Sequence, residues 1–202
     1  MAFLDPDNKE MVAKIVYYGP ERCGKTTCLD YLLEKYRHRV DSDGVMIKSY
    51  KDKPLVFDFL PLDVGKIRGY SVKIQFYTVP GGDNYRSTRR AVLKGADGVV
   101  FVADSMEVRR EINIKYLREL EDHLACMNRS PGSVPIVFQY NKRDLEGKSI
   151  PILSTETMDE DLNPGKKFPS FPTSGLTGEN VVAAMKQGIV FTVTRLQASL
   201  PR

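Results

Sequence analysis

A short glycine-containing stretch constrains the fold of this chain more than any other part of its sequence. Residues 17–27 read Tyr-Tyr-Gly-Pro-Glu-Arg-Cys-Gly-Lys-Thr-Thr and match the phosphate-loop pattern G-x-x-x-x-G-K-[ST]. An apolar run at residues 15–18 precedes the stretch, and apolar residues at helical spacing follow it. A chance glycine turn before a helix would explain the motif but not the strand in front of it. The order of strand, loop and helix therefore predicts a phosphate-binding loop.

The residue types in this loop suit an anion. Gly19 and Gly24 let the backbone turn and approach oxygen atoms closely, and the following amides lie at the positive end of the helix dipole. Lys25 supplies a point charge for phosphate oxygens, and the Thr26 hydroxyl can ligate Mg²⁺. The helix start could also lower the pKa of the Cys23 thiol, although small size is reason enough for a cysteine there. The predicted phosphate-binding residues are Glu21, Arg22, Cys23, Gly24, Lys25, Thr26, Thr27 and, from a later loop, Gly81.

The composition is that of an ordinary globular domain. The chain has 202 residues, of which 28% are charged and 42% hydrophobic, so we read residues 1–202 as one domain. The net charge of +4 is too small and too dispersed to indicate a nucleic-acid partner. Three scattered cysteines favour a reducing cytoplasm. We find no signal peptide, membrane span or lipidation motif and expect no direct membrane anchor.

Apolar periodicity divides the chain into alternating strands and helices. We expect strands at residues 15–18, 55–63, 70–79, 98–104, 135–141 and 167–172. We expect helices at residues 25–37, 86–94, 111–127, 155–162 and 182–196. Residues 1–12 read as loosely ordered, and residues 65–69 read as the turn of an antiparallel hairpin. The alternation predicts a three-layer α/β fold whose central sheet is mostly parallel and has one antiparallel hairpin.

A second chemical signal follows the strand at residues 135–141. Asn141, Lys142 and Asp144 form the pattern N-K-x-D at the carboxyl end of this strand, where α/β sheets bind ligands. A carboxylate at the last position can accept two hydrogen bonds from guanine, a pair of donors that adenine lacks. The lysine stem can lie across the base, and the asparagine can tie the phosphate loop to the base loop. A solvated turn is the alternative, but the preceding phosphate loop favours guanine recognition.

A third loop resembles the weaker base-contacting pattern T-S-A-K. Thr173, Ser174, Gly175 and Leu176 occupy its positions. The glycine keeps the backbone amide that would contact the guanine oxygen, and the leucine loses a flanking contact. The predicted guanine-binding residues are Asn141, Lys142, Asp144, Ser174 and Gly175.

Five segments together carry a family resemblance: KIVYYGP at 14–20, FDFLPLD at 57–63, YTVPG at 77–81, GVVFVADS at 98–105 and NKRDL at 141–145. The chain resembles the MglA family, the Ras-like small GTPases of bacterial gliding motility and cell polarity. Thr78 is informative, because most Ras-like proteins carry a magnesium-supporting aspartate at that position, and this family carries threonine.

The resemblance implies a P-loop small-GTPase fold that binds GTP or GDP with Mg²⁺. It also implies a nucleotide-dependent shift of the strand at residues 55–63 and a Roadblock-type activating protein. The resemblance further implies polarity effectors as partners. It also implies a cytoplasmic protein that reaches a cell pole through its partners.

Four positions depart from the family pattern around the reacting phosphate. Gly82 replaces the glutamine that orients water, Lys53 replaces an intrinsic arginine finger, Pro54 replaces a threonine, and Glu21 replaces a small glycine. An arginine finger alone contributes about 10³–10⁵ in rate, and lysine lacks its bidentate fork. We expect Lys53 and Gly82 to be degenerate catalytic positions and the Glu21 side chain to point outward. The alternative is that nearby groups such as Asp83 take over the roles of the missing catalytic side chains.

Two functions remain open from the sequence. One is a switch that hydrolyses GTP slowly or with a partner's help, and the other is a GTP-binding interaction module that barely hydrolyses GTP. An ATP-using kinase fits poorly, because the N-K-x-D pattern reads guanine. The basic helix that carries Arg86, Arg89, Arg90 and Lys94 could contact an acidic partner or could simply be solvated.

Overall fold

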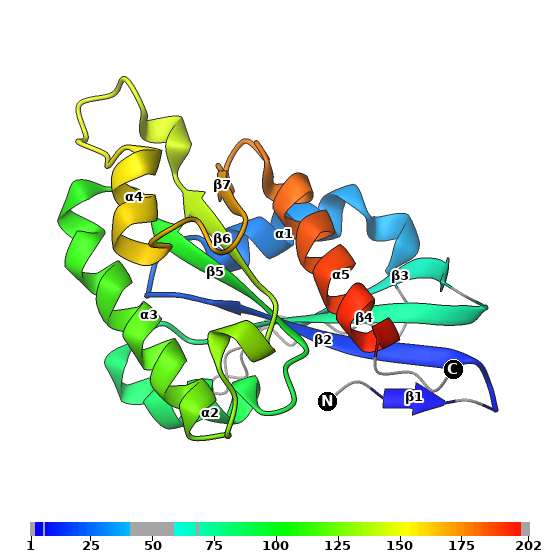
Figure 1. Ribbon diagram of the computed structural model, residues 1–202. Coiled ribbons are helices and arrows are strands. Elements are labelled where there is room, and N and C mark those ends of the chain that lie inside the picture. The colour runs from blue at the N-terminus through cyan, green and yellow to red at the C-terminus, as the bar shows by residue number, and fades with distance from the viewer. Residues whose placement is uncertain (1–2, 6, 41–58, 68, 199–202) are drawn as a thin grey trace.

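A seven-stranded sheet forms the centre of the protein, seen in a computed structural model that describes residues 3–5, 7–40, 59–67 and 69–198 (Figure 1). Six strands follow one another in the order β3-β4-β2-β5-β6-β7, and β1 pairs with β2 beside them. The strands are β1 (Phe3–Asp5), β2 (Glu10–Tyr18), β3 (Phe59–Ile67), β4 (Tyr70–Thr78), β5 (Gly98–Asp104), β6 (Ile136–Asn141) and β7 (Ser170–Pro172). The main helices are α1 (Lys25–Lys35), α2 (Arg86–Leu93), α3 (Arg110–Ala125), α4 (Thr155–Leu162) and α5 (Val181–Ala198).

The strand directions confirm the predicted sheet and add one pair to it. β2 runs parallel to both β4 and β5, and the pairs β5–β6 and β6–β7 are parallel too. β3 and β4 form the expected antiparallel hairpin. The loose order predicted for residues 1–12 is wrong, because β1 pairs antiparallel with the first residues of β2. The missed part of β2 alternates half-buried residues with the buried Met11 and Ala13, a pattern too short to stand out.

The turn predicted at residues 65–69 is also wrong in its extent. β3 continues to Ile67, with a register irregularity between Asp63 and Gly65. Gly65 has φ +89°, and its amide donates to Asp63 Oδ1 at 2.7 Å, so glycine serves a bulge inside the strand. The tight connection falls at Gly69, with φ +84°. Residues 55–58 of the expected strand lie outside the described residues.

Helices cover both faces of the sheet, as the three-layer prediction requires. α1 and α5 pack on one face, and α2, α3 and α4 pack on the other (Figure 1). The final helix contacts β2, β5 and β6 along its length. β5 and β6 are buried at every position, which explains their continuous apolar sequences. Within the described residues, no helix is long and apolar enough to cross a membrane.

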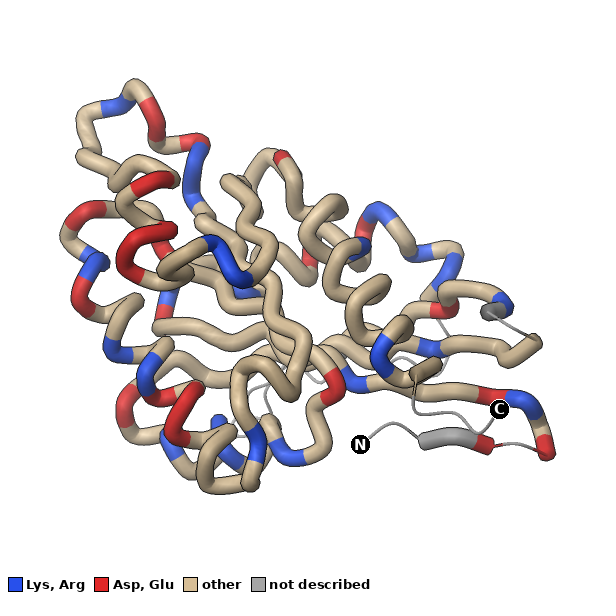
Figure 2. The backbone as a smooth tube through the Cα atoms, viewed as in Figure 1, with Lys and Arg blue, Asp and Glu red and all other residues tan. Residues whose placement is uncertain are grey.

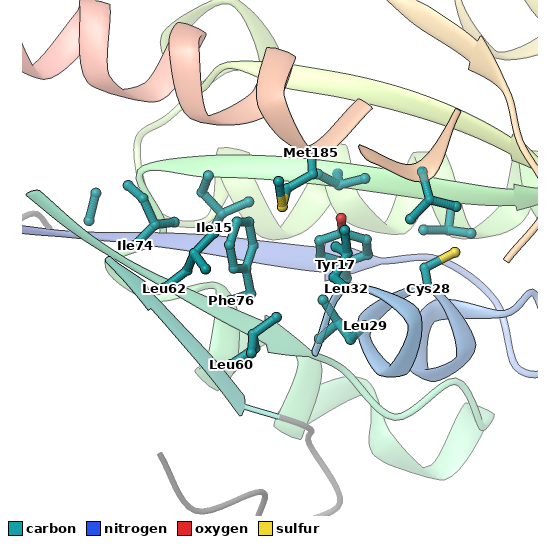
Figure 3. Close-up of a cluster of buried hydrophobic side chains, with 14 of the residues drawn as sticks. Ile15, Tyr17, Cys28, Leu29, Leu32, Leu60, Leu62, Ile74, Phe76 and Met185 are labelled. Carbon is teal, nitrogen blue, oxygen red and sulfur yellow. The ribbon is translucent and has the colours of Figure 1, made fainter. Parts of the chain in front are cut away.

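The α1 side of the sheet has a dense core that fixes the helix after the phosphate loop. Figure 3 shows Leu29 and Leu32 of α1 beside Tyr17 of β2, with Phe76 and Met185 close to them. All these side chains are buried. The tyrosine and phenylalanine rings meet edge to face at 6.1 Å, a favoured aromatic geometry. The start of α1, and with it the phosphate loop, is therefore held against a packed surface.

Candidate functional site

The loop between β2 and α1 can be built only with glycine at two points. Gly19 has φ +145°, and a Cβ there would clash with the Val102 carbonyl oxygen. Gly24 has φ +99°, and a Cβ there would clash with Asn141 Nδ2. Both positions combine a backbone conformation that favours glycine with a close neighbour from another strand end. The loop is thus fixed by β5 and β6 as well as by α1.

Lys25 lies inside this loop. Its side chain is buried, and its Nζ donates to the carbonyl oxygens of Gly19 at 2.9 Å and Pro20 at 2.6 Å. Both acceptors are neutral, and a phosphate oxygen forms a stronger, charge-assisted bond with an ammonium group. The loop therefore places a buried cation where the phosphate-loop motif predicts one.

A hollow of about 420 Å³ opens in front of this loop. Its lining combines the start of α1 with the loop that follows β4, as predicted: Glu21, Arg22, Gly24, Lys25, Thr26, Thr27, Thr78, Val79, Pro80, Gly81, Gly82 and Tyr85. Cys23 is the predicted phosphate residue that does not line it, since this side chain is fully buried. Burial raises the pKa of the Cys23 thiol, so small size rather than reactivity suits cysteine there.

The hollow fits a phosphate group and a small divalent cation. Thr26 and Thr27 are exposed to it at the first turn of α1, where backbone amides lack helical partners. Among the described residues there is no cluster of three or more carboxylate, histidine or cysteine ligands. Mg²⁺ needs few protein ligands when phosphate oxygens and water complete its shell, so the Thr26 hydroxyl suits the predicted role.

The loop after β4 is held against the phosphate loop and against α2 and α3. Gly81 lies so close to the Glu21 backbone that a Cβ would clash with it. Tyr116 Oη donates to the Gly81 carbonyl oxygen, and one guanidinium nitrogen of Arg89 donates to the carbonyls of Pro80 at 3.1 Å and Gly82 at 2.6 Å. Three successive carbonyl groups therefore have side-chain donors, which fixes the peptide planes of the loop.

Arg89 corrects the picture of α2 as a simple basic face. Its side chain is fully buried and forms two hydrogen bonds with Glu119, Nε–Oε1 at 2.6 Å and Nη2–Oε2 at 2.9 Å. Tyr18 Oη donates to the same carboxylate at 2.6 Å. Burial alone would raise the pKa of Glu119, but the bonds from Arg89 and Tyr18 and the Arg89 charge lower it. Burial lowers the pKa of the neighbouring His123.

The positions expected to be degenerate provide little chemistry in the described part of the chain. Gly82 has extended backbone, φ −80° and ψ 151°, and a Cβ there would lie 3.3 Å from the Tyr85 ring and 3.8 Å from Glu21 Oε2. The Glu21 side chain is 59% exposed and lies 3.8 Å from Arg22 Nε, in agreement with the outward orientation we expected. Asp83 is paired with Lys115 at 2.9 Å. Lys53 and Pro54 lie outside the described residues.

Asn141 joins the two predicted halves of the site. Its Nδ2 donates to the Cys23 carbonyl oxygen at 2.7 Å, and its Oδ1 accepts from the Gly175 amide at 2.8 Å and from Thr173 Oγ1 at 3.3 Å. The side chain is buried, so water does not compete for these bonds. The structure thus brings the phosphate loop and both base loops together, although the Gly175 amide is already engaged.

The carboxylate of the N-K-x-D pattern is fixed as well. Asp144 Oδ1 accepts a hydrogen bond from Ser174 Oγ at 2.6 Å, which links the two predicted base loops. Lys142 has φ +72°, and its Nζ donates to Asp104 Oδ2 at 2.7 Å. Asp104 is fully buried at the end of β5. These contacts hold the two side chains that would face the edge and the plane of a base.

Four contributors to the site were not predicted from the sequence. Asp104 orients Lys142, Arg109 donates to the Glu21 carbonyl at 2.6 Å, and Arg89 and Tyr116 hold the loop after β4. Asp104 could have been found, since it ends a buried parallel strand at the edge where ligands bind. The other three lie on or next to helices, where their polar ends give no distinct signal in the sequence.

Comparisons with known proteins agree with this geometry. A model of the ADP-ribosylation factor family, Arf, matches residues 2–190. The chain is 39% identical over 197 residues to the mutual gliding-motility protein MglA of Myxococcus xanthus, covering 98% of each protein. It is 23% identical to the Ras-related protein Rab-27B of Rattus norvegicus, over 93% of this chain and 83% of the relative. It is 26% identical to the ADP-ribosylation factor-like protein 6 of Caenorhabditis briggsae, over 86% and 83%.

Small GTPases of this family bind GTP and GDP with Mg²⁺ and hydrolyse GTP. The sheet order and the loops joined by Asn141 agree with membership of such a family. The family model covers most of the chain, and the similarity to the Myxococcus protein extends over nearly its whole length. The chain therefore belongs to the ADP-ribosylation factor family of small GTPases and is an MglA-type member of it.

Proposed function

We propose that this protein is a GTP-dependent switch whose own catalytic centre is weak. The observation that carries the proposal is the bridge made by Asn141 between the Cys23 carbonyl and the Gly175 amide. A buried asparagine that bonds both loops couples base recognition to phosphate binding within one site. That coupling is what selective binding of a guanine nucleotide requires, on which any GTP-dependent switch depends.

We assign each part of the nucleotide to residues that the structure brings together. Lys25 and the amides of residues 21–27 would hold the phosphates, with Gly81 beside the terminal one. Asp144 and Lys142 would recognise guanine, assisted by Ser174. When Mg²⁺ is bound through Thr26, it supplies charge neutralisation for the phosphate oxygens.

We infer slow turnover from the residues that would border the terminal phosphate. Gly82 has no side chain to position water, and Asp83 is paired with Lys115 rather than free to replace it. The Glu21 side chain points outward, but its Oε2 lies 3.8 Å from where a Cβ on Gly82 would stand, so its bulk crowds the space beside Gly82. Positioning and charge stabilisation supply nearly all of phosphoryl-transfer catalysis. A GTP-binding interaction module that barely hydrolyses GTP is the second candidate, favoured by the same observations.

The biological setting is proposed from similarity. The protein 39% identical to this chain is named for gliding motility, so we propose a role in motility or cell polarity. We propose a Roadblock-type activating protein and polarity effectors as partners. Such partners would bring a cytoplasmic switch to a cell pole, and an activator could supply catalytic groups in trans.

Identification of the bound nucleotide tests the proposal directly. The full chain is purified with Mg²⁺ and heated, and the released nucleotide is identified by chromatography. We expect GDP or GTP from the wild type and none from Lys25→Ala, which removes the buried charge. Circular dichroism verifies that the variant folds. Release of adenine nucleotides, or equal occupancy of the variant, would overturn the assignment.

A further inference from the structure

The edge of the sheet opposite the nucleotide site carries a groove that is lined by basic residues. We propose that this groove binds an acidic segment of a partner protein. The basic groove comprises a hollow beside the ends of α2 and α3 and a smaller hollow beside the end of α5. It lies near the start of β5, whereas the nucleotide site lies at the carboxyl ends of the strands.

The groove consists of two adjoining hollows. The first hollow has a volume of about 710 Å³ and is lined by Ser87, Arg90, Ala91, Lys94, Gly95, Asp97, Cys126, Met127 and Arg129. The second has a volume of about 460 Å³ and is lined by Asp97, Arg129, Arg195, Leu196 and Ala198. Because Asp97 and Arg129 line both, the two hollows adjoin. An extended chain segment fits such a shape better than a compact ion does.

Four cations of the groove are not held in salt bridges within the described part of the chain. Arg90, Lys94, Arg129 and Arg195 have no carboxylate within salt-bridge distance among the residues that the structure describes. Two of them donate instead to neutral backbone oxygens, Arg129 to Ala96 and Arg195 to Gly132. Elsewhere on α2 and α3, Arg86 is paired with Asp122, Arg110 with Asp161 and Lys115 with Asp83.

The described lining holds one carboxylate, Asp97, against four cations, and it favours the charged form of Arg129. Asp97 is 8% exposed, and its Oδ2 accepts the Lys14 backbone amide at 2.9 Å. The Lys14 side chain adds a further positive charge nearby, since its Nζ donates to the Lys94 carbonyl at 3.2 Å. The groove thus has a clear excess of positive charge. Burial also lowers the pKa of Arg129, so an incoming anion would stabilise its charged form.

The lining favours a peptide over a membrane surface. In the view of Figure 2, the basic segments of the described chain are spread over several elements with acidic segments between them. An anionic membrane would favour a continuous basic face, whereas these cations border a concave groove. Ala91, Met127 and Leu196 add apolar contacts between them, and methionine adapts to varied side chains. Acidic residues interspersed with apolar ones match this lining.

Cys126 provides a reporter for the test. It is exposed in the first hollow, whereas Cys23 and Cys28 are buried, so a trifluoroacetonyl label would attach at Cys126 alone. The labelled full chain is titrated with the peptide (Glu-Glu-Leu)₃ and observed by ¹⁹F NMR. We expect a saturable shift that weakens as ionic strength rises, because salt screens these charges. The peptide (Lys-Lys-Leu)₃ should cause no shift.

Charge reversal locates the binding surface. Arg90→Glu with Lys94→Glu changes two exposed residues of the groove and should weaken peptide affinity about tenfold or more. Arg37→Glu with Arg39→Glu makes the same change in charge on an exposed turn after α1 and should leave the affinity within about twofold. If the double variant Arg90→Glu with Lys94→Glu fails to fold, Arg129→Gln, which keeps a hydrogen-bond donor, is measured instead. Unchanged GDP binding in each variant separates this test from the nucleotide assignment.

Three results would overturn the proposal. Equal weakening by both charge reversals would mean that the peptide follows net charge alone. A shift with vesicles of phosphatidylglycerol but not with the peptide would assign the surface to membranes. Saturation by inorganic pyrophosphate without peptide binding would make the groove a small-anion site.

Discussion

Arg89 and Glu119 form a buried, two-pronged ion pair directly beneath the loop that follows β4. The guanidinium bonds both carboxylate oxygens, at 2.6 and 2.9 Å, and donates to the carbonyls of Pro80 and Gly82. The pair therefore connects the helical layer to the loop that borders the phosphate site. Removing either partner deprives the other buried charge of its main counter-charge.

Arg89→Met should lower the free energy of unfolding by about 3–5 kcal/mol, since it leaves the Glu119 carboxylate with the Tyr18 hydroxyl and, as its cation, only Arg86 Nε at 3.9 Å. Arg89→Met with Glu119→Leu should recover part of the loss, because both charges are then absent. The matched control is Arg110→Met, which removes the pair between the exposed Arg110 and Asp161 and should change stability much less than Arg89→Met. Urea unfolding measures all three variants. A double variant less stable than Arg89→Met would refute the isolated-charge explanation.

Stability should decrease in two steps as the pH falls. The pKa of His123 is lowered from 6.5 by burial, so the unfolded state binds this proton first and stability declines below about pH 6.5. The pKa of Glu119 is lowered from 4.5, so its contribution is complete above that pH and is lost as the pH falls through its lowered pKa. His123→Gln should remove the first step and leave the second. Thermal unfolding at several pH values distinguishes the two losses of stability. If the loss near pH 6.5 is unchanged in His123→Gln, it belongs to another group.

The Tyr116 hydroxyl should influence which nucleotide is preferred. Tyr116→Phe keeps the buried ring and removes the hydroxyl's bonds to the Gly81 carbonyl and, at 3.3 Å, to Asp83 Oδ1, so the free energy of unfolding should fall by about 1 kcal/mol. The Gly81 peptide plane is then free to rotate, and GTP affinity should fall several-fold while GDP affinity stays the same. Titration with both nucleotides measures the ratio. An equal loss of affinity for GTP and GDP would show that the hydroxyl has a structural role only.

Asp144→Asn should shift base preference. The variant replaces an acceptor of two guanine hydrogen bonds by a mixed donor and acceptor, and bonds to charged groups contribute about 1.5–3 kcal/mol. GDP affinity should fall about 10- to 100-fold, with a relative gain for xanthosine diphosphate, which presents an acceptor instead. Ser174 holds this side chain at 2.6 Å and should continue to do so in the variant. Wild-type binding of ADP as tight as that of GDP would contradict the assignment.

Turnover by the isolated wild-type chain should be slow, on the order of 10⁻⁴ s⁻¹. Gly82→Gln, Lys53→Arg and Glu21→Gly together should raise the rate, and their effects should couple because they share one transition state. The backbone at Gly82 accepts a side chain, with φ −80° and only a close approach to Tyr85 to relieve. Single-turnover assays without any partner measure the rates. Wild-type hydrolysis well above one turnover per minute would place the protein among self-sufficient GTPases.

The sequence predicted those parts of the fold that depend on local patterns. β5 matches its predicted residues 98–104, because a continuous apolar run ends at glycine and aspartate, and α4 matches residues 155–162. The motif residues Lys25, Asn141 and Asp144 were predicted because their chemistry is tied to fixed spacing. The P-loop and base-loop residues meet in the structure as that spacing requires.

What could not be predicted depends on contacts between distant elements. Arg89 reads as a solvated cation in the pattern of α2, and only packing against α3 buries it beside Glu119. Tyr116 reads as a core aromatic residue, and its hydroxyl contact with Gly81 is invisible in the sequence. The bulge at Gly65 looked like a turn because glycine serves both. The contacts of Arg89 and Tyr116 arise from tertiary packing without a local signature, whereas the bulge was missed because its local signal is ambiguous.

The tethered carbonyls of Pro80, Gly81 and Gly82 have a consequence for the thermodynamics of nucleotide binding. A loop that is ordered by its own protein has already lost its conformational entropy during folding, about 1–2 kcal/mol per residue. Association with a third phosphate then requires no further ordering there, so this loop should add little to the unfavourable entropy of binding. The same preorganisation limits how far the loop can rearrange between nucleotides, which leaves larger movements to other segments of the chain.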